Sequence, residues 1–268
     1  MTIDNYIKQI RQNGKRCFSL KDLVSDLKIS ETNALNMISS KKEQKDIISP
    51  SKGFYVIVPP EHQSQGSIPP EELIPLLMKH LNLDYYVSLL SGAGFYGASH
   101  QKPAKFQVVT NKRIKHPLDF GKVKIEIIYK KSLENLPIKD FTVSTGYLKV
   151  ATPELITYDL FCYKDKSGGL NHIATVLSEL VEAIDTEKLI ALANIINENT
   201  WLQRFGFILE QIDTMDDDKR LLIIKSLESY LSNKRLLYVP LAPEIPKKGF
   251  KRIKKWKIIA NTEIESDL

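Results

Sequence analysis

The segment that organises the chain runs from residue 85 to residue 110 and reads YYVSLLSGAGFYGASHQKPAKFQVVT. Apolar residues recur in its first part at helical spacing: Tyr86, Leu89, Leu90 and Ala93. This spacing predicts a buried helix, and the many Gly, Ala and Ser residues on it would let another backbone approach closely. After Pro103 a short run rich in β-branched residues, 106–110, predicts a core strand. We therefore expect a larger mixed domain to begin near this segment and to follow a smaller basic region.

The first sixty residues contain three amphipathic helix patterns and then two strand patterns. The helices are expected around residues 3–10, 20–27 and 34–38, and the strands at 47–48 and 54–58. Ser19 and Ser30 are suited to cap the second and third helices, and Gly14 is placed to end the first. Pro50 and Gly53 mark a turn between the two strands. Three helices followed by a hairpin is the order of a winged helix.

The third helix of this region is the candidate DNA reader. We interpret Ala34, Leu35 and Ile38 as its buried side, which leaves a polar outer side. The residues expected to face DNA are Thr32, Asn33, Asn36, Ser39, Ser40, Lys41, Lys42, Ser51 and Lys52. Hydroxyl and amide groups suit the major-groove edges of bases, whereas ammonium groups suit phosphates. The alternative is a winged helix that binds protein and has an ordinary solvated face.

The segment 59–70 separates this region from the rest of the chain. It is polar, rich in proline and without periodicity, so we place a domain boundary near residue 68, which gives domains 1–68 and 69–268. Beyond it we expect a half-exposed strand at 123–129, a hairpin around 141–150, and about five helices between 155 and 231. The predicted fold class is α+β: an N-terminal winged helix-turn-helix, then a larger mixed α/β domain with a mainly antiparallel sheet and several helices.

The chain is basic, and its charge is unevenly distributed. Its 268 residues have a formal charge of +6 and a pI near 9.0, with 43% hydrophobic residues. Residues 1–60 hold ten Lys and Arg against six acids, residues 102–131 hold nine against two, and residues 247–257 hold seven against none. Excess positive charge is compatible with nucleic acid but is weak support by itself. Whether the segments 102–131 and 247–257 contact DNA stays open.

Motifs for catalysis or metal binding are absent from the sequence. The five histidines lack paired ligand spacing, the cysteines Cys17 and Cys162 are far apart, and no phosphate-binding glycine loop or nucleophile elbow occurs. We therefore expect no metal, no cofactor and no enzymatic activity. The acids at 216–218 are better explained as a helix start, and His100 with Gln101 as a cap or buried hydrogen bond. No leader or membrane-spanning run is seen, which favours a cytoplasmic protein.

Several blocks of the sequence carry a resemblance to a known family. They are residues 53–61 (GFYVIVPPE), 85–91 (YYVSLLS), 100–103 (HQKP), 106–110 (FQVVT), 152–154 (TPE), 168–170 (GGL) and 203–206 (QRFG). In this order the blocks resemble those of the AbiEi antitoxin family of abortive-infection toxin–antitoxin systems. They span most of the chain, so the resemblance is specific.

The resemblance implies a type IV antitoxin that is also a transcriptional autorepressor. Its winged helix would bind inverted repeats in double-stranded DNA of its own promoter, as a monomer in solution that can bind cooperatively on DNA. Its C-terminal domain would neutralise a nucleotidyltransferase toxin without a stable complex. Two alternatives stay open: an antitoxin that sequesters the toxin directly, and a winged-helix regulator that senses a small ligand through its second domain. The resemblance transfers no individual site residue.

Overall fold

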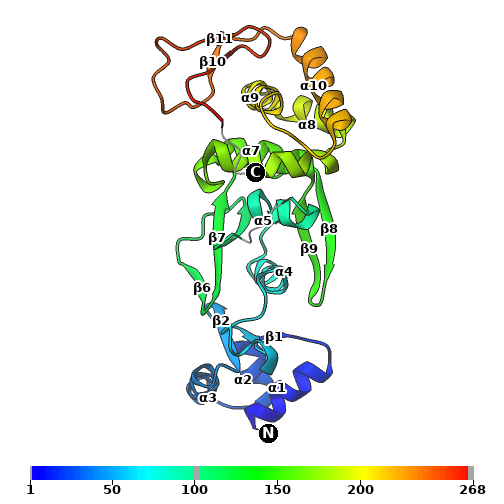
Figure 1. Ribbon diagram of the computed structural model, residues 1–268. Coiled ribbons are helices and arrows are strands. Elements are labelled where there is room, and N and C mark those ends of the chain that lie inside the picture. Colours follow the sequence, from blue (N-terminus) through cyan, green and yellow to red (C-terminus); the bar gives the residue numbers. More distant parts are fainter. Residues whose placement is uncertain (1, 99–102, 265–268) are drawn as a thin grey trace. The chain divides into compact units, whose positions relative to one another are not determined.

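The computed structural model describes residues 2–98 and 103–264, so the predicted pair His100 and Gln101 lies outside the described residues (Figure 1). Helices and sheets both build the chain, which confirms the α+β class. It divides into two compact units. The first comprises Met1–Tyr86, Ala104–Leu133 and Asp140–Lys149, and the second comprises Val87–Pro103, Glu134–Lys139 and Val150–Leu268. Residues 69–86 thus group with residues 1–68, and the domain boundary near residue 68 stays a prediction.

The N-terminal part of the first unit contains three helices and a three-stranded sheet. The elements follow in the order α1 (Ile3–Gln12), β1 (Cys17–Ser19), α2 (Leu20–Leu27), α3 (Glu31–Glu43), β2 (Ile47–Ser51) and β3 (Phe54–Ile57). β3 pairs antiparallel with both neighbours, so the strand order is β1-β3-β2. The helices and the β2–β3 hairpin lie where the sequence predicted them, and only the short strand β1 was not expected.

Hydroxyl side chains begin all three of these helices. The Oγ of Ser19 accepts a hydrogen bond from the N–H of Asp22 at 3.1 Å, and the carboxylate of Asp22 accepts one from the N–H of Ser19 at 2.9 Å. This reciprocal capping box satisfies amides that the helix itself leaves unpaired. At α3 a single bond serves as the cap, since the Oγ of Ser30 accepts from the N–H of Asn33 at 3.2 Å. The predicted starts of α2 and α3 are thereby confirmed.

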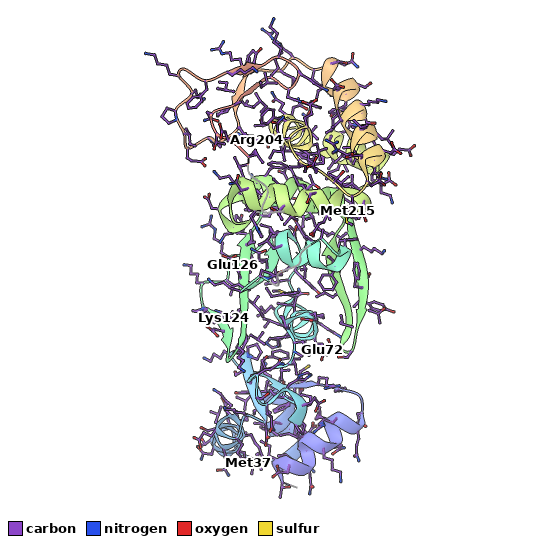
Figure 2. The ribbon with its side chains drawn as sticks, in the orientation of Figure 1. Met37, Glu72, Lys124, Glu126, Arg204 and Met215 are labelled. Atoms are coloured by element: carbon purple, nitrogen blue, oxygen red, sulfur yellow. The ribbon has the colours of Figure 1, made fainter. Side chains whose placement is uncertain are left out.

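The apolar sides of these elements meet in one core. Its largest members include Tyr6, Phe18 and Tyr55, and the rings of Tyr6 and Phe18 meet edge to face with centroids 5.5 Å apart. From α3 the core takes Ala34 and Ile38, while Met37, labelled in Figure 2, packs against its edge. Burial of these side chains fixes which side of α3 faces inward and therefore which side faces solvent.

A six-stranded sheet carries the organising segment. Its strands are β4 (Tyr85–Val87), β5 (Phe106–Thr110), β6 (Leu118–Phe120), β7 (Val123–Tyr129), β8 (Ile138–Val143) and β9 (Gly146–Ala151), in the order β6-β7-β5-β4-β9-β8. The sheet was predicted to be mainly antiparallel, and this is wrong for its centre. β5 pairs parallel with β7, and β4 pairs parallel with β9. The reason is that β6 pairs antiparallel along the far side of β7, so the chain reverses twice between β5 and β7.

The organising segment itself begins as a strand, not as a helix. Tyr85–Val87 form the buried strand β4, and the helix α5 is confined to Leu89–Ala93 before a 3-10 turn at Gly94–Tyr96. Aromatic and β-branched residues favour extended backbone, and this preference outweighs the helical spacing that starts at Tyr86. The predicted strand at residues 106–110 is confirmed as β5.

Helices dominate the rest of the chain. They are α4 (Pro70–Leu81) in the first unit, and α6 (Pro153–Cys162), α7 (Gly169–Leu180), α8 (Thr186–Ile196), α9 (Thr200–Leu209) and α10 (Asp217–Ser232) in the second. The acids at 216–218 begin α10 as predicted, since the Asp216 carboxylate accepts from the N–H of Lys219 at 2.8 Å. Thr152 precedes α6, but its hydroxyl makes no capping bond.

The last part of the described chain packs against α9. It contains the short strands β10 (Val239–Pro240), β11 (Arg252–Ile253) and β12 (Ile258–Ile259). The side-chain amide of Gln203 donates to the carbonyl oxygens of Leu237 and Trp256 at 3.0 Å and of Lys257 at 3.2 Å. The indole of Trp256 lies over Gly206, and its N–H donates to Glu210 at 2.7 Å. The QRFG block therefore anchors the C-terminal segment.

Candidate functional site

Helix α3 presents a polar surface because its apolar residues occupy one stripe. Ala34 and Ile38 are fully or almost fully buried, whereas most of the other residues along the helix are exposed. The expected DNA-facing residues that are exposed on α3 are Thr32, Asn33, Asn36, Ser39, Ser40 and Lys42. Within the described part of the chain their side chains make no hydrogen bond or ion pair. The arrangement leaves hydroxyl, amide and ammonium groups available to an external partner.

The β2–β3 hairpin adds a second exposed element. Lys52 stands at its tip and is exposed, and Ser51 is partly exposed. Gly53 follows with φ of +71°, a conformation that glycine adopts without strain, so the strands can reverse within two residues. The turn therefore projects one ammonium group beside a short hydroxyl side chain.

Lys41 departs from the expectation for the candidate surface. Its side chain is only 11% exposed, and its Nζ lies 2.5 Å from a carboxylate oxygen of Asp4 and 3.1 Å from one of Asp46. It also donates to the side-chain oxygen of Gln44 at 2.7 Å. These three acceptors hold the ammonium group inside the first unit. The prediction that Lys41 contacts phosphate is therefore withdrawn, and we assign it to the packing of α3.

The sequence contained the signal for this correction. Ala34, Ile38 and Lys41 lie at positions i, i+4 and i+7, which is the spacing of one helix stripe. Leu35 is the converse case: it was assigned to the buried side, yet it is 43% exposed and stands outside the core cluster. It sits one position beyond the stripe, so its apolar side chain joins the polar surface.

The basic segment 247–257 is in part structural. Lys255 forms ion pairs with Glu210 at 2.5 Å and Glu228 at 2.8 Å, which tie it to α9 and α10. Arg252 and Lys257 both lie over the ring of Tyr238, at 5.4 and 5.1 Å from its centroid. These contacts use part of the positive charge within the second unit.

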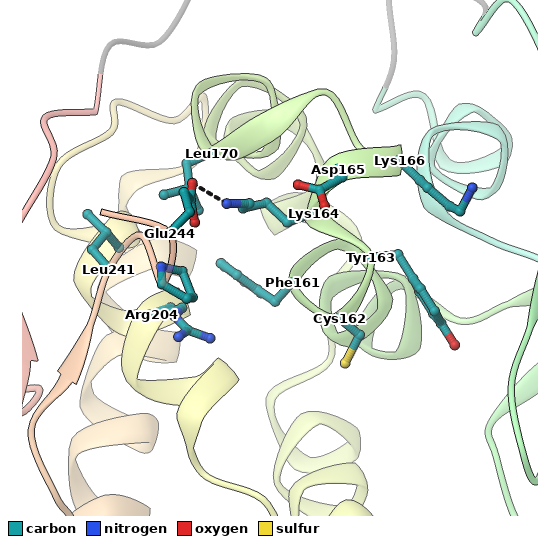
Figure 3. Close-up of a pocket in the computed structure, with 11 residues that line it drawn as sticks. Phe161, Cys162, Tyr163, Lys164, Asp165, Lys166, Leu170, Arg204, Leu241 and Glu244 are labelled. Carbon is teal, nitrogen blue, oxygen red and sulfur yellow. Dashed lines mark hydrogen bonds and ion pairs between the residues drawn. The ribbon is translucent and has the colours of Figure 1, made fainter. Parts of the chain in front are cut away.

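A pocket of about 600 Å³ lies in the second unit. It is lined by the end of α6 and the turn after it, by the start of α7, by α9, and by the segment that follows β10; its residues include Phe161, Lys164, Leu170, Arg204 and Glu244 (Figure 3). Lys164 and Glu244, which both line it, form an ion pair. This hydrogen bond with Lys164 holds the pKa of Glu244 below its usual value. The pocket combines apolar walls with charged groups from elements far apart in sequence.

Metal and membrane sites find no support in the described residues. Within residues 2–98 and 103–264, no group of three or more His, Cys, Asp or Glu side chains is arranged to hold a metal ion. Of the helices in those same ranges, none combines the length and the apolar character required for crossing a membrane.

Comparisons with known proteins give a family match for part of the chain and a similar fold among solved structures. Residues 86–211 match the family model described as the AbiEi antitoxin C-terminal domain. None of the curated proteins matches the chain. Among solved structures, the chain is similar to the RV2827C protein from Mycobacterium tuberculosis, with a TM-score of 0.62 and 15% sequence identity over 95% of this chain and 89% of that one. At this identity the likeness supports the fold alone.

Proposed function

The chain belongs to the AbiEi antitoxin family through residues 86–211, and from this premise we propose that it is an antitoxin that also represses its own operon by binding DNA. The family domain gives the chain the role of an antitoxin in a toxin–antitoxin system. The residues proposed to bind DNA lie before this domain, most of them on the surface of α3.

The observation that carries the proposal is the exposed polar side of α3. A DNA-reading helix needs one side that seats it on its own domain and another that offers donors and acceptors to the groove. Ala34 and Ile38 provide the first side, and Thr32, Asn36 and Ser39 provide the second. An asparagine amide can both donate to and accept from an adenine edge, and hydroxyl groups can bond to either kind of base.

Charge on the same elements supports contacts with the phosphate backbone. Lys42 near the end of α3 and Lys52 at the hairpin tip are both exposed, and residues 1–60 carry ten basic residues against six acids. Ammonium groups that neutralise phosphates release bound counterions, which makes the affinity fall with salt. We assign to Lys42 and Lys52 the role of orienting α3 on the duplex, without a preference for sequence.

Footprinting on the DNA upstream of the protein's own gene tests the proposal. The full-length chain is used, because Lys122 N–H donates to the carbonyl oxygen of Gln65 at 2.9 Å and a cut near residue 68 would separate these partners. We expect protection of inverted repeats, with a steep loss of protection at high salt. Equal protection of unrelated DNA would leave only non-specific binding, and no protection at all would refute the DNA-binding role.

The other half of the proposal concerns the antitoxin role. We propose that this role is separable from DNA binding and that the chain neutralises a nucleotidyltransferase toxin without forming a stable complex with it. Its test uses the full-length chain with Thr32, Asn36 and Ser39 all changed to Ala, expressed together with the toxin of its operon. We expect the toxin to be neutralised although repression is lost, and the toxin not to be retained in a pull-down. Retention of the toxin in a stoichiometric complex would favour direct sequestration, and failure to neutralise it would tie both roles to DNA binding.

A further inference from the structure

The guanidinium group of Arg204 has unused hydrogen-bonding capacity in the pocket of the second unit. Its Nε–H donates to the carbonyl oxygen of Pro240 at 3.2 Å, which fixes one edge of the guanidinium plane. Its two terminal nitrogen atoms have no hydrogen-bond or ion-pair partner among the described residues. Arg204 is half-buried, and burial lowers its pKa, which is the direction expected for a cation partly removed from water. A guanidinium in this state is stabilised by an anion.

The carboxylates near Arg204 do not supply this anion. Glu244 is engaged with Lys164, and Glu198 acts on Arg204 through its charge without a hydrogen bond. Figure 3 shows Phe161 and Arg204 on the same side of the Lys164–Glu244 ion pair, and both residues line the pocket. The donors that remain therefore belong to a pocket whose lining also includes an aromatic ring.

The lining of the pocket limits the charge and shape of a ligand. Three basic residues, Lys164, Lys166 and Arg204, stand against the acids Asp165 and Glu244, which leaves one net positive charge. The remaining walls are mostly apolar, formed by Phe161, Leu170, Leu241 and Pro243. A volume of about 600 Å³ is within the range of small-molecule sites. One positive charge matches a monoanion better than a phosphate dianion, and the apolar walls match a hydrocarbon or aromatic body.

We propose that this pocket binds a small organic carboxylate, with the two carboxylate oxygens on the terminal nitrogens of Arg204 and the apolar body against Phe161 and Leu170. Arg pairs with carboxylates through two parallel hydrogen bonds, which fixes the orientation of the ligand. The Lys164–Glu244 ion pair holds the segment after β10 against the turn after α6 and so shapes the mouth of the site. This proposal does not depend on DNA binding. It gives the second unit a ligand site of its own.

Binding of benzoate to the full-length chain, followed by ligand-observed NMR and by thermal unfolding, tests the proposal. Benzoate is the probe, benzamide is its neutral counterpart of similar shape, and AMP is a dianionic probe. For a ligand of this size we expect a dissociation constant of about 1 mM. Benzamide and AMP should bind at least about ten-fold more weakly, because one lacks the charge and the other exceeds it.

Two variants separate the site from general effects on folding. Arg204→Met should weaken benzoate binding about ten- to hundred-fold, the range for a lost hydrogen bond to a charged group. Since Arg204 also bonds to Pro240, Leu170→Phe provides an independent variant that narrows the pocket and keeps the guanidinium. Leu170→Phe should therefore also weaken benzoate binding, although Arg204 is still present. Absence of saturable binding, equal binding of benzamide, tighter binding of AMP, or benzoate binding that is unchanged in both variants would overturn the proposal.

Discussion

Two adjacent lysines on α3 are predicted to have opposite roles, and this contrast tests how the structure separates packing from DNA contact. Lys41 is held by Asp4, Asp46 and Gln44, whereas Lys42 is exposed without a partner in the described chain. We expect Lys41→Met to lower the free energy of unfolding and Lys42→Met to leave it unchanged. For DNA binding we expect the opposite: Lys42→Met should reduce the salt dependence of the affinity, and Lys41→Met should leave it unchanged.

The magnitude for Lys41 follows from the exposure of its partners. Asp4 is 68% exposed, so its ion pair contributes about 0–1 kcal/mol. Asp46 is 31% exposed and also accepts a hydrogen bond from Gln63 at 2.8 Å, so the loss of Lys41 does not leave it unpaired. The bonds to Asp46 and Gln44 then add about 1 kcal/mol. We expect a total loss of about 1–2 kcal/mol in urea unfolding.

The magnitude for Lys42 concerns the salt dependence of binding. Removing one phosphate contact should reduce the slope of log affinity against log salt concentration by about 0.9. Fluorescence anisotropy on upstream DNA at several salt concentrations measures this slope, with Lys8→Met, an exposed lysine of α1, as the control. The reasoning is refuted if Lys41→Met changes the slope as much as Lys42→Met does, or if Lys41→Met unfolds at the wild-type urea concentration.

The hydrogen bond with Asp4 raises the pKa of Lys41, and this sets the pH range of its effect. A raised lysine pKa gives stability that is present below the unfolded value of about 10.5 and is lost as the pH rises through the folded value. The difference between wild type and Lys41→Met should therefore be constant from about pH 6 to pH 9. A difference that changes within this range would contradict the assignment of these ion pairs.

Four further substitutions test the second unit. Gly206→Ala should lower stability by about 1–3 kcal/mol, since its Cβ would lie 2.3 Å from the ring of Trp256, whereas Gly94→Ala, with φ of −58° and open space, should raise it by about 0.4–1 kcal/mol in the same unfolding assay. Gln203→Leu should expose the C-terminal segment to protease earlier than wild type, because the side-chain amide that bonds to three of its carbonyl groups is removed. Burial raises the pKa of Tyr96 to about 12, so stability should fall between about pH 10 and pH 12, and less steeply in Tyr96→Phe.

Much of the fold could be predicted because its local signals agree with its packing. The capping residues Ser19 and Ser30, the turn at Gly53 and the acidic start of α10 all lie where the sequence placed them. Each of these signals acts within a few residues, so no distant partner can change its meaning. The same locality explains why the helices after residue 152 were recognised as separate elements.

The errors arose where distant partners decide the structure. Whether β5 pairs with β6 or β7 depends on contacts across the sheet, which the sequence does not reveal. Tyr86 fits a helical stripe, yet strand pairing of residues 85–87 prevails. The charge of Lys41 favours a phosphate contact, but its position on the stripe of Ala34 and Ile38 places it beside Asp4 and Asp46.

The candidate functional residues also include some that the sequence could predict and some that it could not. The exposed polar side of α3 was predictable from periodicity, and every α3 residue predicted to face DNA is exposed except Lys41. The pocket around Arg204 was not predictable, because its lining comes from residues 161–170, 204 and 241–244, which only the tertiary structure brings together. Sequence could identify the QRFG block but not the acceptor that holds Arg204 in place.

The most direct test of the central claim compares two amide side chains on different helices in the same footprinting experiment. Asn36 lies on the exposed side of α3 and Gln9 on the exposed side of α1. We predict that Asn36→Ala weakens protection of the upstream inverted repeats at least about ten-fold, whereas Gln9→Ala protects them as wild type does. Wild-type protection by Asn36→Ala, or an equal loss in both variants, would contradict the claim that α3 reads the DNA.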